Sequence, residues 1–241
     1  MLRSLLTASV PAMTTLPLPP AELRGLVGNT DTVEEFERVG RSIAGMMEAL
    51  GLLPAGQRVL DVGCGCGRVA AHLVASPIAA YEGFDRNPRL IAWAAEQITP
   101  LDSRFHFQLV KVASPYDAFD GFHGEIPAGE LTFPFADGLF DVALLSSVFT
   151  HMPVGDSRRY LAELARVLSP TGQVLATWFL TDAEEGIVEG LGYRHNRRDQ
   201  AAAIAAAGFS GRRLFETPPP SPGDPPQQEW FLLSRSSAPA G

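Results

Sequence analysis

The sequence predicts a doubly wound α/β domain, in which helices cover both faces of a mostly parallel β-sheet. Three observations predict it. Short apolar runs alternate along the chain with segments whose apolar residues have helical spacing. The first two apolar runs each end in an aspartate, Asp61 and Asp85, and glycines follow the first of them. Since alternating strands and helices require parallel strands with right-handed crossovers, the helices must lie on both faces of one sheet.

The length and the composition limit the fold and the partners. The chain has 241 residues, of which 46% are hydrophobic, and this is enough for the core of one α/β domain. Its formal net charge is −8 and no lysine or arginine cluster is longer than a pair, so we expect small-molecule partners and no nucleic acid. No apolar run reaches about 18 residues, so we expect a cytoplasmic protein without a membrane partner. The oligomeric state is not predicted.

The N-terminal part is expected to hold a leader and one helix. Residues 1–20 are interrupted by Ser and Pro, which predicts a disordered leader rather than a secretory signal. Residues 31–50 place apolar side chains at helical spacing, with Asp31 as the N-cap and Gly51 as the stop. This helix belongs to an N-terminal helical segment, residues 21–57, that packs against the sheet before the first strand.

The other elements follow in chain order. Residues 113–133 form a long connection that contains Tyr116 and His123, and connections of this length in compact domains are usually functional. A proline-rich turn at residues 218–226 separates the last two strands. We expect strands at residues 59–62, 81–85, 105–112, 142–145, 173–179, 212–217 and 228–234, and helices at residues 68–73, 88–98, 156–168 and 197–207.

The turn after the first strand has the composition of a ligand-binding loop. Gly63, Gly65 and Gly67 occupy alternate positions, and glycine tolerates positive φ and lets backbone groups approach a ligand closely. The G-x-G-x-G spacing differs from the G-x-G-x-x-G that nucleotide phosphates favour. Both cysteines, Cys64 and Cys66, lie in this turn, too close for an unstrained disulfide and too few for a metal site, so no metal is predicted.

A second strand end supplies an acid. Asp85 stands 22 residues after Gly63, close to the spacing at which an acid binds ribose hydroxyls in doubly wound folds. Because the carboxyl ends of parallel strands meet at one edge of a sheet, the two strand ends predict a single nucleoside site.

Further motifs follow in order. Asp85 is followed by Arg86, residues 133–141 read FPFADGLFD, residues 147–152 read SVFTHM, and residues 166–172 read RVLSPTG. With VLDVGCGCG at residues 59–67, they resemble the motifs of the class I S-adenosylmethionine-dependent methyltransferases, over about half of the chain. The resemblance implies a Rossmann-like methyltransferase fold, with a seven-stranded sheet that ends in an antiparallel C-terminal strand.

The resemblance also divides the chain. It implies an S-adenosylmethionine-binding methyltransferase domain at residues 58–235, followed by a disordered tail at 236–241. Segments that precede the first motif in this family can close over the cofactor, so residues 21–57 are a candidate lid as well as a packing helix.

The resemblance implies S-adenosylmethionine as the cofactor and suggests which residues hold it. Asp61 would meet the ammonium end, Asp85 would accept hydrogen bonds from the ribose hydroxyls, and Arg86 would pack on the adenine face. The implied cofactor contacts are Asp61, Gly63, Cys64, Gly65, Gly67, Asp85, Arg86 and Ser146.

One position departs from the family pattern. The family often has an acid after the third strand, near the adenine amino group, whereas residues 110–114 read VKVAS here. Backbone groups, or a residue of the following loop near Glu130 or Leu131, would then contact the adenine edge.

Methyl transfer is an in-line displacement that depends mainly on positioning, so a catalytic base is optional. His151 is the first candidate for a base, because it follows the fourth strand and histidine titrates near neutral pH. The other interpretation is a packed structural histidine. Tyr116, His123, Tyr193 and His195 are alternative bases, and the candidate substrate contacts are Tyr116, His123 and Trp178, with Phe179 beside them.

The predicted function is therefore an S-adenosylmethionine-dependent methyltransferase that acts on O, N or C of a small, partly apolar metabolite. One alternative is a non-catalytic or repurposed S-adenosylmethionine-binding partner protein. A second alternative, an NAD-dependent oxidoreductase, is disfavoured by the spacing of the glycines.

Overall fold

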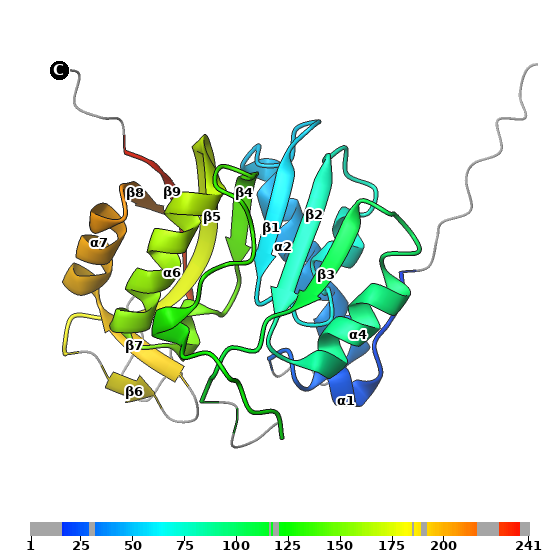
Figure 1. Cartoon of the computed structure of the whole chain (residues 1–241), viewed down its shortest axis with the longest axis horizontal. Coiled ribbons are helices and arrows are strands. Elements are labelled where there is room, and N and C mark those ends of the chain that lie inside the picture. Colours follow the sequence, from blue (N-terminus) through cyan, green and yellow to red (C-terminus); the bar gives the residue numbers. More distant parts are fainter. Residues whose placement is uncertain are drawn as a thin grey trace, which may run out of the picture.

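The computed structural model describes residues 16–28, 32–115, 117, 121–184, 186–188, 192–215 and 227–236. One mixed sheet runs through its centre (Figure 1), with the strand order β3-β2-β1-β4-β5-β7-β6 and with β9 and β8 joined to the other part of β5. The strands are β1 (Arg58–Val62), β2 (Ala80–Asp85), β3 (Phe105–Leu109), β4 (Phe140–Leu145), β5 (Leu168–Thr181), β6 (Gly186–Val188), β7 (Gly192–Asn196), β8 (Phe209–Arg213) and β9 (Glu229–Arg235).

The helices alternate with the strands as predicted. They are α1 (Ala21–Arg24), α2 (Val33–Ala49), α3 (Ala70–Leu73), α4 (Pro88–Gln97), α6 (Val154–Val167) and α7 (Arg197–Ala206), with 3₁₀ turns η1 (Ala128–Glu130) and η2 (Phe149–His151).

The predicted fold class is confirmed. Strands β1 to β5 pair in parallel, and β9 runs antiparallel to both β5 and β8. The path β3-β2-β1-β4-β5-β9-β8 is the predicted seven-stranded sheet with its antiparallel C-terminal strand. The sequence analysis did not predict the β6–β7 hairpin, in which β7 runs parallel to the last three residues of β5, Phe179–Thr181.

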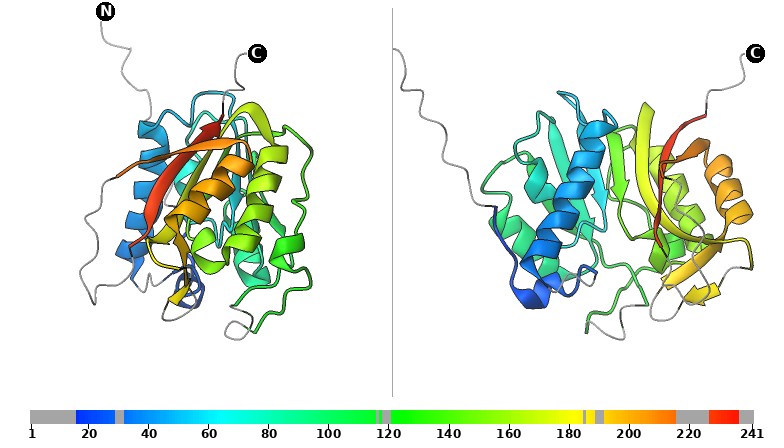
Figure 2. Two further views of the ribbon diagram at one scale, coloured as in Figure 1. Left: turned by 90° about the vertical axis from the view of Figure 1, so that its left-hand side faces the viewer. Right: turned by 180° about the vertical axis from the view of Figure 1, so that it is seen from behind.

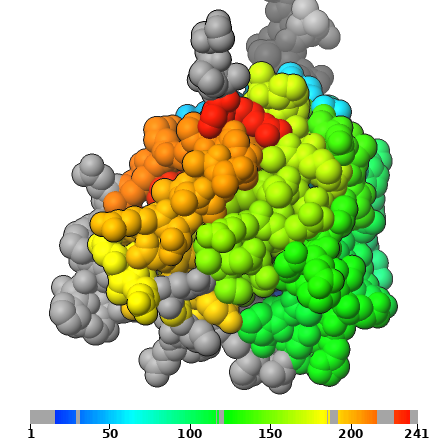
Figure 3. Space-filling view, turned by 60° about the vertical axis from the view of Figure 1, so that its left-hand side comes forward, coloured from blue at the N-terminus to red at the C-terminus, as the bar shows by residue number. Residues whose placement is uncertain are grey.

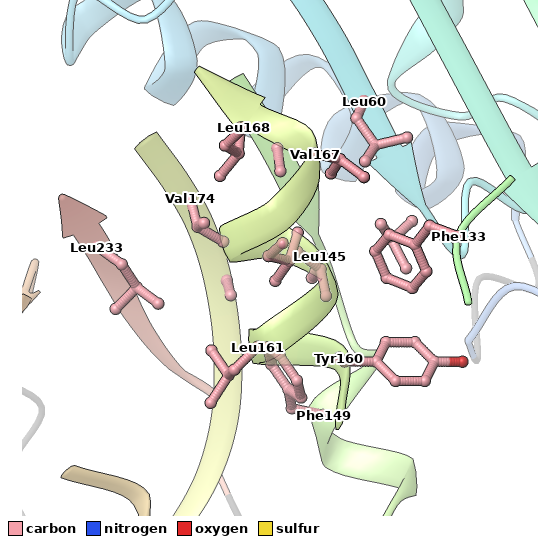
Figure 4. Close-up of a cluster of buried hydrophobic side chains, with 14 of the residues drawn as sticks. Leu60, Phe133, Leu145, Phe149, Tyr160, Leu161, Val167, Leu168, Val174 and Leu233 are labelled. Atoms are coloured by element: carbon pink, nitrogen blue, oxygen red, sulfur yellow. The ribbon is translucent and has the colours of Figure 1, made fainter. Parts of the chain in front are cut away.

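Two apolar cores lie on the two faces of the sheet, and β1 shows how the sequence separates them. Val59 packs with α2, α3 and α4 on one face, whereas Leu60 and Val62 pack with α6 and α7 on the other. Figure 2 shows α2 on one side of the sheet and α6 and α7 on the opposite side. Figure 4 shows the second core, to which the sheet contributes Leu60 and Leu145 and α6 contributes Leu161 and Val167. Because successive side chains of a strand alternate between faces, a fully apolar strand serves both cores.

Side-chain caps fix where three helices begin. The hydroxyl of Thr32 accepts a hydrogen bond from the Glu35 N–H (3.1 Å), so the cap of α2 stands one residue after the predicted cap, Asp31, which lies outside the described residues. Asn87 caps α4 and Asn196 caps α7 in the same manner. A polar cap satisfies backbone N–H groups that the first turn leaves without a helical partner.

Several predicted regions fall on residues that are not described. Residues 1–15 of the predicted leader and residues 237–241 of the predicted tail lie outside the described residues. Within the described part of the chain, no helix is both long and apolar enough to cross a bilayer.

Candidate active site

A large cavity opens where the carboxyl ends of β1, β2 and β4 meet. Its volume is about 1240 Å³. The strand order changes direction at β1, between β2 and β4, and ligands bind at such switch points in open α/β sheets. The cavity brings together seven of the eight predicted cofactor contacts and the residues that follow the end of β4. Its walls include Asp61, Gly63, Cys64, Gly65, Asp85, Arg86, Ser146, Ser147 and His151.

The glycine loop is shaped by positive φ angles and close contacts. Gly63 has φ 72° and Gly65 has φ 56°. A Cβ on Gly63 would lie 2.8 Å from Val148, and one on Gly65 would lie 2.5 Å from Val27. Glycine is therefore required at both positions by conformation and by space.

The backbone N–H groups of this loop bind the protein itself, which corrects the expectation that they face a ligand. The N–H groups of Gly63 and Cys64 donate to the Phe84 carbonyl at 2.8 and 3.1 Å, and the Gly65 N–H donates to the Asp85 carboxylate at 3.0 Å. The Gly67 N–H donates to the Cys64 carbonyl at 3.0 Å. Phosphate-binding glycine loops direct their N–H groups at the anion. This loop instead offers carbonyl oxygens and open space.

Asp61 lies one residue before the end of β1, in a nearly dry environment. The residue is 3% exposed, and its carboxylate accepts a hydrogen bond from the hydroxyl of the fully buried Tyr81. The pKa of Asp61 is raised to about 7 as the net result of four effects: burial, the largest, and the charge of Asp85 raise it, whereas the Tyr81 hydrogen bond and the charge of Arg68 lower it. A cation placed beside a carboxyl group in this environment stabilises the ionised form of that group.

Asp85 ends β2 and holds the loop in place. One carboxylate oxygen accepts from the Gly65 N–H at 3.0 Å, and the other accepts from the Asn87 N–H at 2.8 Å. Burial raises the pKa of Asp85, while these two hydrogen bonds and Arg86 lower it. The carboxylate also takes a backbone hydrogen bond from Arg86, and because a carboxylate has about four lone-pair sites it can still accept from a further donor in the cavity.

Arg86 lines the cavity, but its guanidinium turns toward the loop after β3. It forms an ion pair with Asp117, donates to the Phe122 carbonyl at 3.1 Å and to the Val112 carbonyl at 3.3 Å, and lies 5.0 Å from the centre of the Phe122 ring. These contacts favour a role in fixing the loop wall over the predicted stacking on adenine.

Gly67 and the thiols of Cys64 and Cys66 have packing roles. A Cβ on Gly67 would lie 2.3 Å from Ile98, so this glycine admits α4 to the core, and it does not line the cavity. The prediction that Gly67 contacts the cofactor is therefore wrong, because Gly67 lies outside the cavity. Cys64 does line the cavity, but burial raises the pKa of its thiol well above the ordinary value, so the group stays protonated.

The residues after β4 form a strained corner. Ser147 has φ 63°, the one described non-glycine residue with positive φ. Its N–H donates to the Thr177 hydroxyl at 2.8 Å, and its Oγ pairs with the side-chain amide of Gln228, which donates to it at 2.7 Å. Strain that the surrounding structure holds in place is typical of functional sites. Ser146, the predicted contact, lines the cavity beside it.

Two histidines, His151 and His195, lie at the turn η2. His151 lines the cavity, as expected of a candidate base. His195, an alternative base, is fully buried on β7, and its Nε2 lies 2.9 Å from the carbonyl oxygens of both Phe149 and Met152. Since carbonyl oxygens only accept, Nε2 carries the proton and donates to both. His195 therefore holds the turn that presents His151 and does not face the acceptor.

The predicted substrate contacts do not all line the cavity. Trp178 is 1% exposed and stacks on Phe149 in the core, so its assignment is wrong, whereas its neighbour Phe179 lines the cavity. His123 is exposed and does not line the cavity, and Tyr116 lies outside the described residues. Successive residues of a strand face opposite sides, which is why Phe179 reaches the cavity and Trp178 does not.

The adenine-edge candidates also fail. Glu130 is exposed, and Leu131 is 1% exposed with its carbonyl bound to the Arg159 side chain at 2.7 Å. Neither residue lines the cavity. Lys111, at the position where the family often has an acid, pairs with Glu125 on the surface at 2.7 Å.

Several cavity residues were not predicted as site residues. Asp156 and Tyr160 were expected only as part of the helix at residues 156–168, and they lie one turn apart on the same side of α6. Others come from segments far apart in the sequence, namely α2, β7, β9 and the residue before β9. Among them are Arg38, Val39, Ser42, Ile43, Met46, Gly192, Gln228 and Trp230.

The segment before α2 closes one side of the cavity. Val27 lies over Gly65, and its carbonyl accepts a hydrogen bond from Arg68 Nη1 at 2.9 Å. Arg68 comes from the turn that leads into α3, so the glycine loop and the N-terminal segment are joined directly. Among the described residues, no group of three His, Cys, Asp or Glu side chains is placed to bind a metal ion.

Comparison with known proteins agrees with this geometry. A sequence profile of the methyltransferase domain family matches residues 35–213. The methyltransferase GfsG of Streptomyces halstedii is 32% identical over 144 residues, which cover 57% of this chain and 45% of that protein. The chain spans about half the length of the curated relatives that it matches.

Solved structures share the fold. The 1,6-didemethyltoxoflavin-N1-methyltransferase of Burkholderia thailandensis, with bound 1,6-didemethyltoxoflavin and S-adenosylhomocysteine, has a TM-score of 0.56 and 20% identity, covering 92% of each chain. The magnesium protoporphyrin IX methyltransferase of Synechocystis PCC 6803, with bound S-adenosylmethionine, has a TM-score of 0.55 and 18% identity, covering 83% of this chain and 79% of that one. Because the family profile covers most of the sequence, the chain belongs to the methyltransferase domain family, whose members use S-adenosylmethionine as the methyl donor.

Proposed function

We propose that the protein transfers a methyl group from S-adenosylmethionine to O, N or C of a small, partly apolar acceptor. The observation that carries this proposal is the single cavity of about 1240 Å³ at the switch point of the sheet. Drug-sized ligands occupy pockets of roughly 300 to 1,000 Å³, so this volume has room for the cofactor and a second small molecule.

The residues on the β1 and β2 side of the cavity fit the cofactor. Its ammonium and sulfonium groups are cationic, and this side offers the carboxylates of Asp61 and Asp85 and a loop whose N–H groups are already bound. Asp85 would accept from the ribose hydroxyls with its remaining lone pairs, and Asp61 would balance the ammonium charge. Gly63 and Gly65 would let the methionine part approach the backbone.

The residues on the β4, β5 and β9 side fit an acceptor. Val39, Ile43 and Met46 of α2 and Trp230 of β9 give this part an apolar wall, and Phe179 adds an aromatic ring. Ser42, Tyr193 and Gln228 supply a few polar groups among them. A mainly apolar wall with a few polar groups is the usual composition of a small-molecule site.

When bound, the cofactor supplies a methyl group that its positive sulfur already activates. The protein contributes positioning, which supplies roughly 7 to 11 kcal/mol in the best intramolecular cases. His151 is the described histidine that lines the cavity. We propose that it accepts the proton that an O–H or N–H acceptor loses, while His195 keeps its turn in place.

Residues 21–57 act in this proposal as a lid. Val27 over Gly65 and the bond from Arg68 to the Val27 carbonyl place this segment between the cofactor side and solvent. Exclusion of water strengthens the electrostatic interactions inside the site.

The two alternatives are less well supported. An NAD-dependent oxidoreductase needs loop N–H groups for the pyrophosphate, and here those of Gly63, Cys64 and Gly65 bind the protein. A non-catalytic partner protein would need only the cofactor part of the cavity. This chain also has an apolar wall between α2 and Trp230, which cofactor binding alone does not require.

A screen of small acceptors with a labelled methyl donor tests the proposal. We expect label on a partly apolar acceptor, with turnover reduced in His151→Ala at saturating acceptor. Asp85→Ala should weaken binding of S-adenosylhomocysteine by about 1.5 to 3 kcal/mol, the usual value of hydrogen bonds to a charged group. Unchanged affinity in that variant would remove Asp85 from the site, and wild-type turnover in His151→Ala would discard the base.

A further inference from the structure

Several residues that line the cavity have no role yet in the proposed function. Val112, Ser114 and Pro115 follow the end of β3. Ala128 belongs to η1, and Pro153 and Asp156 lie at the start of α6. If Asp85 holds the ribose and the glycine loop holds the methionine part, the base is expected among these mostly apolar residues.

Asp156 is the carboxylate among these residues. It lies in the first turn of α6, and its Oδ1 is 2.8 Å from the position that a Cβ on Gly129 of η1 would take. Within the described part of the chain its carboxylate makes no hydrogen bond and no ion pair, in contrast to Asp85. Figure 3 shows α6 between α7 and the green segment that leads to β4, and α6 packs on η1 of that segment.

Asp156, Asp85 and Tyr160 line the same cavity, and Tyr160 lies one turn after Asp156 on α6. The charges of Asp156 and Asp85 both raise the pKa of Tyr160, whose main shift comes from burial. The Tyr160 ring packs edge-on against Phe133, which in turn packs on Phe84, the residue before Asp85. Figure 4 shows the Tyr160 hydroxyl pointing away from the apolar cluster. The partial burial of Asp156 raises the pKa of its carboxyl group.

We propose that Asp156 accepts a hydrogen bond from the exocyclic amino group of the cofactor's purine and thereby selects adenine. The amino group is the donor on the adenine edge, and a carboxylate is a pure acceptor when ionised. A charge-assisted bond of this kind is stronger than a neutral one. This inference rests on the proposed ribose site at Asp85, and it gives α6 the task of the acid that residues 110–114 lack.

A purely structural role for Asp156 predicts something different. An acid in the first turn of a helix interacts favourably with the helix dipole, which affects stability and not ligand choice. Asp199 provides a matched control, because it is an exposed acid in the first turn of α7 and does not line the cavity.

The test compares two ligands on three proteins. S-adenosylhomocysteine carries the amino group, and S-inosylhomocysteine carries a carbonyl oxygen in its place. Calorimetry should show that the wild type and Asp199→Asn prefer the adenosyl ligand by roughly tenfold to a hundredfold. Asp156→Asn should lose most of this preference, because an amide donates to the carbonyl as readily as it accepts from the amino group.

Each outcome decides one question. An unchanged ligand ratio in folded Asp156→Asn overturns the inference, and so does an equal loss of preference in Asp199→Asn. If Asp85→Ala keeps full affinity for S-adenosylhomocysteine, the ribose site itself is misplaced, which is a failure of the proposed function. Reduced affinity in Asp85→Ala together with an unchanged ratio in Asp156→Asn rejects only the role of Asp156.

Discussion

His195 holds the turn that carries His151. Its Nε2 lies 2.9 Å from the carbonyl oxygens of Phe149 and Met152, the first residue of this turn and the residue that follows His151. His195 comes from β7, in the hairpin that extends the sheet after β5. The hairpin therefore contributes to the cavity in two ways, because Gly192 and Tyr193 of β7 line it and His195 supports the turn that carries His151.

Replacing His195 tests this link. His195→Phe keeps a ring of similar size but leaves two buried carbonyl oxygens without their donor, which should cost about 1 to 3 kcal/mol of stability. We expect kcat to fall because the His151 turn is released, with little change in the affinity for S-adenosylhomocysteine. Urea denaturation and steady-state kinetics measure the two effects. His195→Gln, which keeps a donor, should recover part of kcat.

The matched control for that variant is His123→Phe, since His123 is exposed and lies outside the cavity. It should leave kcat and stability unchanged. A His195→Phe protein that is destabilised but retains the wild-type kcat and pH profile would show that the bond supports only the fold.

The buried carboxyl of Asp61 should make cofactor binding depend on pH. Because burial raises its pKa to about 7, the free protein holds Asp61 partly protonated near neutrality. A cationic ligand favours the ionised form, so affinity for S-adenosylhomocysteine should rise with pH through about 7, by at most about tenfold for each pH unit. Calorimetry from about pH 5.5 to 8.5 measures this, and a flat profile contradicts it.

The same group has the opposite effect on the stability of the free protein. Its pKa is higher in the folded chain than in the unfolded chain, where the ordinary value is 3.8. The folded state therefore binds more protons between about pH 4 and 7, and the Asp61 contribution to stability falls as pH rises through that window. Tyr81→Phe removes the hydrogen bond that lowers the pKa of Asp61, so it should move the midpoint of the binding profile to higher pH.

Arg68 should control how fast the cofactor leaves. Its Nη1 donates to the Val27 carbonyl at 2.9 Å and so holds the N-terminal segment over Gly65. Arg68→Met keeps much of the side-chain volume but loses that bond, and a bond to a charged group is worth about 1.5 to 3 kcal/mol. Stopped-flow measurement should show release of S-adenosylhomocysteine accelerated roughly tenfold or more.

Arg89→Met serves as the comparison for the Arg68 variant. Arg89 also contacts the N-terminal segment, through Glu22, but both side chains are more than half exposed, at 56% and 77%. Exposed ion pairs contribute little, so its release rate should match the wild type. Equal acceleration in both variants would indicate general loosening of the segment rather than a specific bond.

Gly67 should prove to be a packing residue. A Cβ there would lie 2.3 Å from Ile98 at φ 75°, so Gly67→Ala should lower stability by about 1 to 3 kcal/mol. The folded protein should bind S-adenosylhomocysteine with wild-type affinity, because Gly67 does not line the cavity. Thermal unfolding and calorimetry measure both quantities, and Gly67→Ala with Ile98→Val should recover part of the stability.

The order and type of the elements could be predicted because the local signals agree. Apolar runs, helical spacing and turn residues recur in one consistent order, and β1 to β5, α2, α4, α6 and α7 form where they were expected, within a few residues. The β6–β7 hairpin could not be predicted, because β6 has three residues and gains its pairing only from β7, which in turn needs the end of β5. Such short strands carry no pattern of their own.

The site could be predicted only as far as strand ends determine it. Asp61, Gly63, Gly65 and Asp85 line the cavity because they sit at the carboxyl ends of neighbouring strands. The direction of a long side chain is a tertiary property, and so Arg86 turned out to contact Asp117. Trp178 and Phe179 illustrate the same limit, since both faces of a buried strand are apolar and the sequence does not reveal which face meets a cavity.

The internal bonding of the glycine loop also determines how binding proceeds. Because the N–H groups of Gly63, Cys64 and Gly65 already have acceptors in the protein, the chain loses the conformational freedom of this loop when it folds and not when a ligand arrives. A preorganised receptor loses less entropy on association than one that must order a loop. The methyl donor thus meets a preorganised loop, and if residues 21–57 act as the proposed lid, their opening sets the rate at which the donor exchanges.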